Sequence, residues 1–442
     1  MNIAEFKDRA FSEAIKKGCA AAEIYFSEGD SFNVDVLEGD LNEYQVSKQF
    51  GVNLRVKLNG KDGYAYTETL DNPEALVLKA MDNAIVIETV DEHPMQGESE
   101  YVEVKREKSP LDSMSEKEKI DFCLEVERRI KATDSRVARV DGCAVMSETG
   151  RTCIYNTLGL SAEETYNVAL SYVVPIMVQD GEHKMGMAFR SGKKALDMDE
   201  MIAEAIEETA IQFNASSVPV GKYDIILRNT TAASLLSAFS SMFSAEQAQK
   251  GLSLLANKEG TVIANELITI VDNPFHEEAP RAFDGEGVPS VITTVVENGE
   301  LKTLLHNLKT AKKAGVQSTS NAGRSLTSPI GVSPSVFYIE PREIDYSDLL
   351  KKLNNGLVIT SLAGLHSGVN PISGEFSLLA SGLLIENGEV VRSVDQITLS
   401  GSFIELLSNV NAIGSDLKFD LSFGSIFGSP SLLIGSMQIS GK

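Results

Sequence analysis

The chain has 442 residues, of which 43% are hydrophobic and 23% are charged, and its formal net charge at pH 7 is −23. This length accommodates two or three domains, each with a core of its own. Nucleic-acid binding is not expected, because a surface this acidic repels phosphates, whose affinity for proteins comes mainly from Lys and Arg. No run approaches the roughly 18 apolar residues of a membrane-spanning helix, and the N-terminus lacks the apolar stretch of a signal peptide. These features predict a cytoplasmic protein that does not enter a membrane.

The chain opens with a predicted amphipathic helix and a β-meander. Apolar residues between Ile3 and Ala14 recur at helical spacing, and Gly18 ends the helix. A series of short strands is predicted to follow, punctuated by turns at residues 38–40 and 59–60. Strands joined by such short turns pair in antiparallel fashion.

A polar stretch separates this meander from a second helix. Residues 91–110 have few apolar anchors and are predicted to form an exposed excursion, with a break between two subdomains near residues 91–114. The next helix begins after Ser115, and Glu118 completes a capping box with that serine.

The region up to the middle of the chain repeats the pattern of strands followed by a helix. Strands are predicted within residues 137–190, and a helix follows Asp197. This recurrence is a weak indication of internal duplication. Residues 214–221 have the composition of a linker. We therefore expect an N-terminal domain over residues 1–213 and a C-terminal domain over residues 222–442.

The C-terminal half is predicted to be rich in β-structure. It begins with a strand at residues 223–227 and a helix at residues 230–249. Two segments, VVENGEL at 295–301 and LIENGEV at 384–390, carry Asn-Gly between apolar residues and predict hairpins with type I′ turns. The whole chain is therefore predicted to be α+β: an N-terminal α+β domain with antiparallel meanders, and a mostly antiparallel β domain with a few helices.

Histidines do not form a recognisable metal motif. His276 is followed by Glu277 and Glu278, but Pro280 disfavours the helix that a metalloprotease motif needs, so a surface turn is expected. The other four histidines are scattered singly: His93, His183, His306 and His366. A composite zinc site built from distant positions stays open as an alternative, although nothing in the sequence favours it.

Two other short patterns have structural interpretations. His366 and Ser367 are neighbours, and adjacent side chains of a strand point to opposite faces, so they do not form a nucleophile and base pair. The pattern FDGEGVP contains Gly285 and Gly287 but does not enter a helix as a phosphate loop does, and it is expected to be a tight turn.

Ordered motifs in the second half resemble a known family. The first block contains ANELITIVDNP, FDGEGVP, ENGELK and STSNAGR, and the second contains SGVNPISGEFSLLASGLLIENGE, ITLSGSFIELLSNVNAIGSDL and GSPSLLIGSMQISG. In this order they closely resemble the PmbA/TldD family of metallopeptidases, also called modulators of DNA gyrase. The N-terminal half matches this family more loosely.

The resemblance implies a zinc motif, which this chain lacks. Catalytic members carry HExxxH on a helix before the first block, and a cysteine in the glycine-rich C-terminal region. Here the corresponding segment reads TAASLLSAFSSMFSA, and the C-terminal FDLSFGSIFGSPSLLIG has no cysteine. Zinc needs imidazole, thiolate or carboxylate ligands. The degenerate segment, with Ser237, Ala238 and Met242, is therefore expected to bind no metal, and the chain is expected to hold no cofactor.

By this resemblance the chain is expected to be a PmbA/TldE-type member, inactive as a peptidase on its own. It would form a heterodimer with a TldD-like catalytic subunit that carries the zinc, and the pair would degrade unfolded or extended peptides in proteolysis, peptide maturation or antitoxin turnover. A homodimer is left open as the assembly of the chain when it is alone. One alternative is a stand-alone homodimeric peptide-binding protein without chemistry, and another is an enzyme with relocated chemistry.

Polar positions of the two blocks are the candidates for a peptide cleft. Side chains of Ser and Asn in such loops also serve turns, which is the competing interpretation. The candidates are Asn321, Arg324, Ser367, Asn370, Glu375 and Ser377.

Overall fold

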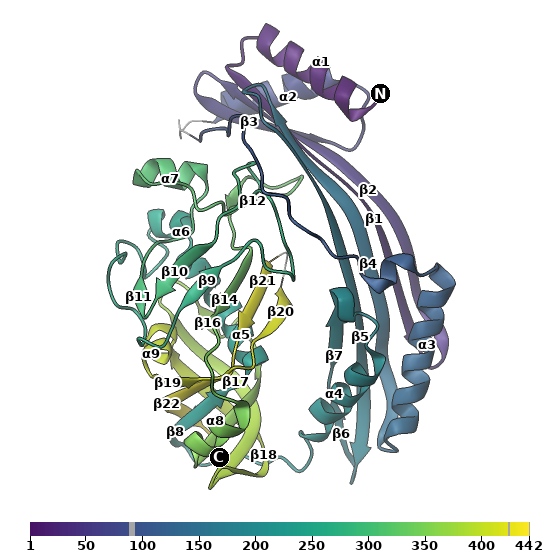
Figure 1. Ribbon diagram of the computed structural model, residues 1–442, viewed down its shortest axis with the longest axis vertical. Helices are drawn as coiled ribbons and strands as arrows, with labels where there is room; N and C mark the ends of the chain where they lie inside the picture. The colour runs from purple at the N-terminus through teal and green to yellow at the C-terminus, as the bar shows by residue number, and fades with distance from the viewer. Residues whose placement is uncertain (88–92, 423–424, 442) are drawn as a thin grey trace. The chain divides into compact units, whose positions relative to one another are not determined.

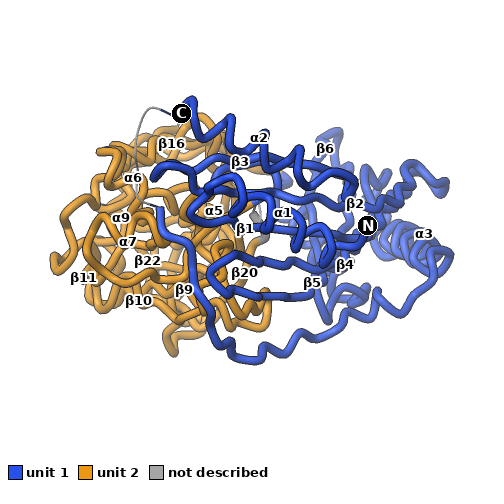
Figure 2. Tube along the Cα trace, turned by 90° about the horizontal axis from the view of Figure 1, so that it is seen from above, with its two compact units in different colours: residues 1–213, 325–329 blue, residues 214–324, 330–442 orange. Residues whose placement is uncertain are grey.

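A sheet of long antiparallel strands forms the framework of the N-terminal unit (Figure 1). The computed structural model describes residues 1–87, 93–422 and 425–441. The chain divides into two units, an N-terminal one of residues 1–213 and 325–329 and a C-terminal one of residues 214–324 and 330–442 (Figure 2).

Seven strands make up the N-terminal sheet, in the order β3-β2-β1-β4-β5-β6, with β7 also paired to β5. The strands are β1 (Ala21–Leu37), β2 (Asp40–Leu58), β3 (Lys61–Thr67), β4 (Val137–Asn156), β5 (Ser161–Gln179), β6 (Glu182–Met185) and β7 (Ala188–Ser191). The helices are α1 (Ile3–Lys16), α2 (Pro73–Val86), η1 (Pro110–Ser113), α3 (Glu116–Thr133), η2 (Gly192–Lys194) and α4 (Met198–Ala210). Helix, strands and helix thus occur twice, with β1 and β4 paired at the centre.

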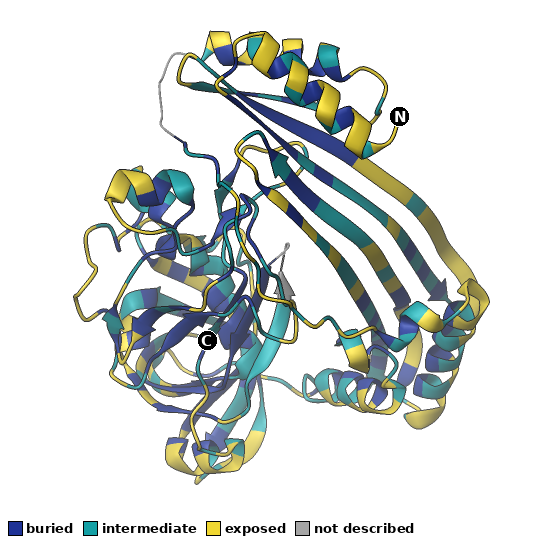
Figure 3. Cartoon of the chain, turned by 45° about the horizontal axis from the view of Figure 1, so that its top comes forward, coloured by how far each residue is buried: buried dark blue, intermediate teal, exposed yellow. Residues whose placement is uncertain are grey.

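Helices pack on one face of this sheet near both ends of the long strands. Ile24 and Phe26 of β1 belong to a core with α1 and α2, while Val34 and Val36 belong to a separate core with α3 and α4. All four positions have even numbers, so their side chains lie on the same face of the strand. The first half of β2 is exposed and its second half is buried (Figure 3).

The strands are longer than the sequence predicts. β1 and β2 have 17 and 19 residues, where short strands were expected. The polar centre of β1, from Ser27 to Ser31, suggests an interruption, but it is hydrogen-bonded continuously between β2 and β4. Partners on both sides satisfy the backbone, so the strand continues through residues of low β-propensity.

The excursion expected over residues 91–110 is irregular but is not exposed throughout. Residues 91 and 92 lie outside the described part of the chain. His93 and Met95 are buried, and the buried guanidinium of Arg55 donates hydrogen bonds to the carbonyl of His93 and to Asp62. A buried cation needs such partners, which explains why this polar segment is held against the sheet.

The C-terminal unit contains a closed barrel and an open sheet. Its strands are β8 (Gly221–Leu227), β9 (Ile270–Asp272), β10 (Thr293–Glu297), β11 (Glu300–Leu301), β12 (Ala322–Gly323), β13 (Gly331–Val332), β14 (Val336–Ile339), β15 (Gly356–Ala363), β16 (Val369–Asn370), β17 (Glu375–Glu386), β18 (Glu389–Ser402), β19 (Val410–Ile413), β20 (Lys418–Ser422), β21 (Ser425–Ser429) and β22 (Leu432–Ser440). Its helices are α5 (Asn229–Phe239), η3 (Ser240–Phe243), α6 (Ala245–Gln249), α7 (Leu308–Ala314), α8 (Tyr346–Leu353) and α9 (Phe403–Ser408).

Strand pairing closes the barrel. The strands β15, β8, β22, β18 and β17 are hydrogen-bonded in this order, and β17 pairs again with β15. Closure leaves these five strands with few free edges. The open sheet has the order β11-β10-β9-β14-β21-β20. Most pairings are antiparallel, with β15 to β8 and β14 to β21 as parallel ones.

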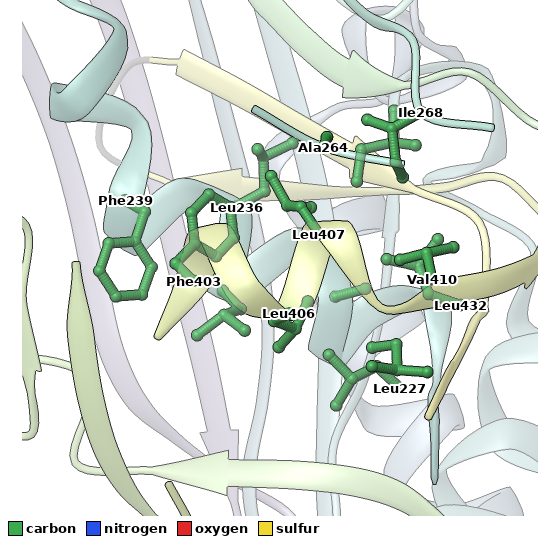
Figure 4. Close-up of a cluster of buried hydrophobic side chains, with 14 of the residues drawn as sticks. Leu227, Leu236, Phe239, Ala264, Ile268, Phe403, Leu406, Leu407, Val410 and Leu432 are labelled. Carbon is green, nitrogen blue, oxygen red and sulfur yellow. The ribbon is translucent and has the colours of Figure 1, made fainter. Parts of the chain in front are cut away.

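One large hydrophobic core joins the barrel to α5 and α9. The ring of Phe239 on α5 stacks on that of Phe403 on α9, with ring centroids 4.5 Å apart (Figure 4). Leu236, Leu406 and Leu407 are fully or almost fully buried beside them. The N-terminal residues of α9 and the C-terminal residues of α5 are thereby fixed relative to the barrel strands.

The predicted fold class is confirmed, because the structure is α+β with mostly antiparallel sheets. Both Asn-Gly hairpins are present: β10 and β11 join at Asn298-Gly299, and β17 and β18 join at Asn387-Gly388, with positive φ at all four positions. Among the described helices, none combines the length and apolarity that a membrane crossing requires.

Candidate functional site

A pocket lined largely by hydroxyl groups lies in the C-terminal unit where the degenerate metal segment falls. We call it the hydroxyl pocket, and its volume is about 310 Å³. It is lined by Ser237, Ser240, Ser241, Ser244, Gln247, Leu305, Val332, Ser333, Pro334, Ser425 and Phe427. These residues come from the α5 to α6 region, the segment before α7, β13 and β21.

A break in the predicted helix shapes this pocket. The single helix expected over residues 230–249 is wrong, because α5 ends at Phe239, a 3₁₀ turn follows, and Ser244 is extended before α6. The N–H of Leu305 donates to the carbonyl of Phe243 (2.8 Å), and the N–H of Ala245 donates to the carbonyl of Leu305 (3.0 Å). These tertiary hydrogen bonds outweigh local helix propensity.

Several hydroxyls of the pocket have no hydrogen-bond partner within the described part of the chain. The side chains of Ser237, Ser240 and Ser241 make no hydrogen bond with any other described residue. Ser244 is only 7% exposed, and its hydroxyl accepts one long bond of 3.5 Å from the N–H of Gln247. Because a hydroxyl can also donate, the buried Ser244 keeps an unused donor beside the pocket.

The residues of the hydroxyl pocket do not fit a zinc ion. Zinc is held by imidazole, thiolate or carboxylate groups, and the described lining contains none of them. Of the degenerate segment, Ser237 lines the pocket, Ala238 is half-buried, and Met242 is fully buried in the hydrophobic core. Nowhere among residues 1–87, 93–422 and 425–441 do three His, Cys, Asp or Glu side chains gather as metal ligands would.

A second pocket collects four of the six cleft candidates. We call it the glutamate pocket. It has a volume of about 660 Å³ and is lined by Ser367, Gly368, Val369, Asn370, Glu375, Phe376, Ser377, Gly401, Ser402 and Glu405. Register explains part of this grouping, because Asn370, Glu375 and Ser402 are opposite one another on β16, β17 and β18.

Side chains at the rim of the glutamate pocket also shape its turn. The Oδ1 of Asn370 accepts hydrogen bonds from the N–H groups of Ile372 and Ser373, at 3.0 and 3.2 Å. The hydroxyl of Ser373 donates to Glu375 at 3.3 Å. The side chain of Asn370 thus has the turn-forming role that its residue type suggests, in addition to its place on the pocket.

Neither Asn321 nor Arg324 is among the lining residues of either pocket, although Asn321 is hydrogen-bonded to Ser333 of the hydroxyl pocket. Asn321 is fully buried, and its Nδ2 donates to Asp272 Oδ2 at 2.7 Å. Arg324 is half-buried, and its Nη1 lies 3.4 Å from the carbonyl of Gly285 as a hydrogen-bond donor. A Cβ on Gly285 would approach Ala322 O within 2.9 Å, so glycine is required where FDGEGVP meets β12.

The motifs of the first family block form a buried polar cluster. Asp272 accepts hydrogen bonds from Asn321 and from the N–H and hydroxyl of Ser335. Asp284 accepts from three backbone N–H groups, those of Glu286, Val288 and Ala322. Carboxylates bound by several donors can be buried without a metal ion. The cluster ties the turn of FDGEGVP to the start of β12.

Burial shifts the acidity of this cluster. It raises the pKa of Asp272, against the opposing effects of Arg281 and the hydrogen bonds from Asn321 and Ser335. Burial, together with the neighbouring Glu286, raises the pKa of Asp284 to about 7. Burial also lowers the pKa of His306, whose Nδ1 lies 3.2 Å from the hydroxyl of Thr310. The sequence predictions missed this cluster, because its carboxylates occur in segments that read as turns.

The expected surface turn at His276 is present, and its imidazole has a packing role. The ring lies 4.5 Å from that of Phe419 and 5.7 Å from that of Tyr338, measured between centroids. Residues 276–279 lie outside regular helices and strands. The segment therefore does not present a helical zinc motif.

Three domain models of one family match the chain in order. They are the PmbA/TldA metallopeptidase domain 1 over residues 22–84, the central domain over residues 109–213 and the C-terminal domain over residues 220–441. The last model alone covers about half of the chain.

Relatives of full length carry metalloprotease names. A metalloprotease of Archaeoglobus fulgidus is 29% identical over 405 residues, which cover 90% of this chain and 92% of the relative. The metalloprotease PmbA of Escherichia coli O157:H7 is 23% identical over 434 residues, which cover 95% and 92% of the two chains.

Solved structures share the fold along its whole length. A crystal structure from Thermotoga maritima, described as a candidate modulator of a DNA gyrase, has a TM-score of 0.91 at 35% identity and covers 99% of this chain and 100% of its own. TldE from Thermococcus kodakarensis has a TM-score of 0.89 at 21% identity, with the same coverage. The domain models, the relatives and the fold agree, and the chain belongs to the PmbA/TldD metallopeptidase family.

Proposed function

We propose that this chain is the non-catalytic, PmbA/TldE-type subunit of a cytoplasmic two-subunit metallopeptidase that acts on unfolded or extended peptides. The observation that carries the proposal is the hydroxyl pocket. The segment that should supply HExxxH lines a pocket there, but with serines in place of zinc ligands. A zincin needs both the metal and a general base, and neither kind of side chain is on the described lining.

Preservation of the fold supports a continuing role beside a catalytic chain. The relatives include proteins named for PmbA and for TldD, so both types occur within the family. In the proposed assembly, the TldD-like subunit carries the zinc and this subunit shapes the shared peptide cleft. When alone, the chain would pair with itself through the related surface, since two-fold pairing is the commonest form of self-association.

Mixing experiments test the partner role. The purified chain is combined with the TldD-type homologue of the same organism, and the products are analysed by size exclusion with light scattering. We expect a mixed dimer, and faster hydrolysis of a reduced, denatured protein than the homologue shows alone. The same protein in its folded form is the matched control and should be cut slowly, because folding hides its extended segments.

The control replaces the glutamate of the homologue's HExxxH by glutamine. The mixed dimer should still form, and hydrolysis should stop, since this chain contributes no base. The proposal is wrong if the homologue is fully active alone and never pairs with the chain. Chelator-sensitive hydrolysis by the isolated chain would equally overturn it.

A further inference from the structure

We infer that the hydroxyl pocket binds an uncharged segment of an extended peptide, through hydrogen bonds from its serine hydroxyls to the peptide main chain. The inference deepens the proposed function and rests on it for the choice of a peptide as the ligand. The replaced metal segment is thereby assigned a binding task in place of a catalytic one.

The first support is the set of unused hydrogen-bonding groups on one wall. Ser237, Ser240 and Ser241 have hydroxyls with no partner among the described residues, and the side-chain amide of Gln247 is equally unengaged there. Each hydroxyl can donate and accept. A peptide unit has one N–H that needs an acceptor and one C=O that needs a donor. The hydroxyls on this wall can supply both.

A buried hydroxyl on the lining is a second support. Ser244 is 7% exposed and caps α6, where its hydroxyl accepts from the N–H of Gln247 at 3.5 Å, and it donates to no other described residue. Leaving a buried donor without an acceptor is unfavourable. By contrast, the buried hydroxyl of Ser425 is satisfied by the Ser333 hydroxyl and the Pro334 carbonyl.

The absence of charge from the lining selects a neutral ligand. No described residue of the lining is Asp, Glu, His, Lys or Arg. Of the nearby carboxylates, Glu246 already pairs with Lys250 at 2.7 Å, and Asp420 accepts a hydrogen bond from Ser234 at 3.1 Å. An ionic side chain entering the pocket would lose hydration without gaining a counter-charge, which is costly.

The opposite wall and the volume of the pocket further restrict the kinds of ligand that fit. Leu305, Val332, Pro334 and Phe427 supply an apolar surface. A volume of about 310 Å³ lies at the lower end of the range of ligand pockets. A short stretch of main chain with small neutral side chains fits this combination of hydroxyls and apolar contacts.

A thiol-protection experiment locates the peptide. The four native cysteines are free and buried, so Ser241→Cys adds one accessible thiol to the full-length chain. The probe is a ten-residue peptide of Gly, Ala, Ser and Asn, and modification of the thiol by a maleimide is followed with and without it. We expect labelling to slow at least fivefold. The matched control is Ser347→Cys, at an exposed position of α8, where the peptide should have no effect.

Affinity measurements test the chemistry of recognition. Fluorescence anisotropy compares the labelled neutral peptide with versions that carry Lys or Asp at the two central positions. We expect the charged versions to bind about tenfold more weakly. The combined Ser237→Ala, Ser240→Ala and Ser241→Ala variant should lose about tenfold in affinity for the neutral peptide, as expected from the loss of two or three modest hydrogen bonds. Ser347→Ala should bind as the unmodified chain does.

The results separate this inference from the proposed function. Equal labelling with and without peptide, no binding of the neutral peptide, or an unchanged affinity of the triple variant would each overturn the inference. Assembly with the catalytic homologue is measured independently of these variants. If the mixed dimer forms and hydrolyses peptides while the pocket variants behave normally, the partner role stands and the hydroxyl pocket is not its peptide site.

Discussion

Asn321 shows how a candidate binding residue can belong to the interior. Its side chain is fully buried, donates to Asp272 at 2.7 Å and accepts from the hydroxyl of Thr319 at 2.7 Å. An amide placed between a buried carboxylate and a hydroxyl satisfies both, and its geometry leaves nothing for a ligand. The main role of Asn321 is therefore to stabilise the folded state.

We predict that Asn321→Ala lowers the free energy of unfolding by about 1–3 kcal/mol, because it leaves the buried Asp272 with one donor fewer. Urea unfolding followed by circular dichroism measures this change. The control Asn411→Ala removes an exposed amide on β19 and should alter stability by less than about 0.5 kcal/mol. A variant that loses peptide binding at unchanged stability would show that Asn321 reaches the ligand after all.

Asp284 makes the stability of the chain depend on pH. Burial and the nearby Glu286 raise the pKa of Asp284 to about 7, with Arg281 acting in the opposite direction. In the unfolded chain this carboxyl has its ordinary pKa near 4. Between these two values the folded state keeps a proton that the unfolded state releases. Stability from this group is therefore complete below pH about 4 and is lost as the pH rises to about 7.

We predict that the stability of the unmodified chain, relative to that of Asp284→Asn, falls between pH 5 and pH 8. The asparagine carries no charge at either pH, so the difference between the two proteins reports this carboxyl together with its interaction with Glu286. Urea unfolding at both pH values measures it, and the expected change is on the order of a few kcal/mol. A difference that stays constant or grows with pH would contradict the raised pKa.

Among the structural elements, hairpins could be predicted and the helix break could not. Asn298-Gly299 and Asn387-Gly388 adopt positive φ at both positions, as local chemistry alone requires for a type I′ turn. The break at Ser244 depends instead on hydrogen bonds with Leu305, which is distant in sequence. A local sequence pattern cannot reveal a hydrogen-bond partner as distant as Leu305. The sequence therefore predicted one continuous helix, and the pocket that forms at the break was not predicted.

The candidate site also has a part that the sequence could predict and a part that it could not. Asn370 and Glu375 were predictable as neighbours because their motif forms one turn between paired strands. The buried cluster around Asp272 and Asp284 was not, since acidic residues in Gly-rich segments usually indicate exposed turns. These carboxylates can be buried because hydrogen-bond donors from distant parts of the sequence, such as the N–H of Ala322, satisfy them.

Closure of the barrel depends on a glycine at the contact between β15 and β17. A Cβ on Gly382 would lie 1.8 Å from the carbonyl oxygen of Val358 and 2.8 Å from its carbonyl carbon. These atoms belong to the backbone of the neighbouring strand, so a rotamer change cannot relieve the clash. The two strands must separate to accept any side chain here.

We predict that Gly382→Ala destabilises the chain by about 1–3 kcal/mol or more, as overpacking of a rigid contact does. Thermal and urea unfolding measure the loss. Gly221→Ala, at the start of β8 in the same barrel, is the control, because its Cβ would meet only ordinary van der Waals contacts, at 3.5 Å. Equal stability of the two variants would mean that closure does not constrain β17.

At the scale of the whole molecule, charge opposes nucleic-acid binding despite the family's link to DNA gyrase. The formal net charge is −23, and non-specific binding to DNA relies on cations that neutralise phosphates. We predict no retardation of a labelled 30-base-pair duplex at about 150 mM salt, and none for single-stranded DNA. The control is the same assay with a basic DNA-binding protein. Retardation that weakens steeply with salt would contradict the prediction and reveal a local basic surface.

Metal content tests the difference that we propose between this chain and a catalytic partner. No zinc-ligand side chain is on the described lining of the hydroxyl pocket, and structural zinc contributes on the order of 10–16 kcal/mol of binding free energy where it is held. We predict that the isolated chain keeps less than about 0.1 zinc per molecule after dialysis against a weak chelator, and that a strong chelator leaves its Tm unchanged. The mixed dimer should retain one zinc per pair, which follows the partner when the subunits are separated. One tightly held zinc in the isolated chain, with a Tm that falls on chelation, would contradict this prediction. It would also contradict the assignment of the metal to the partner.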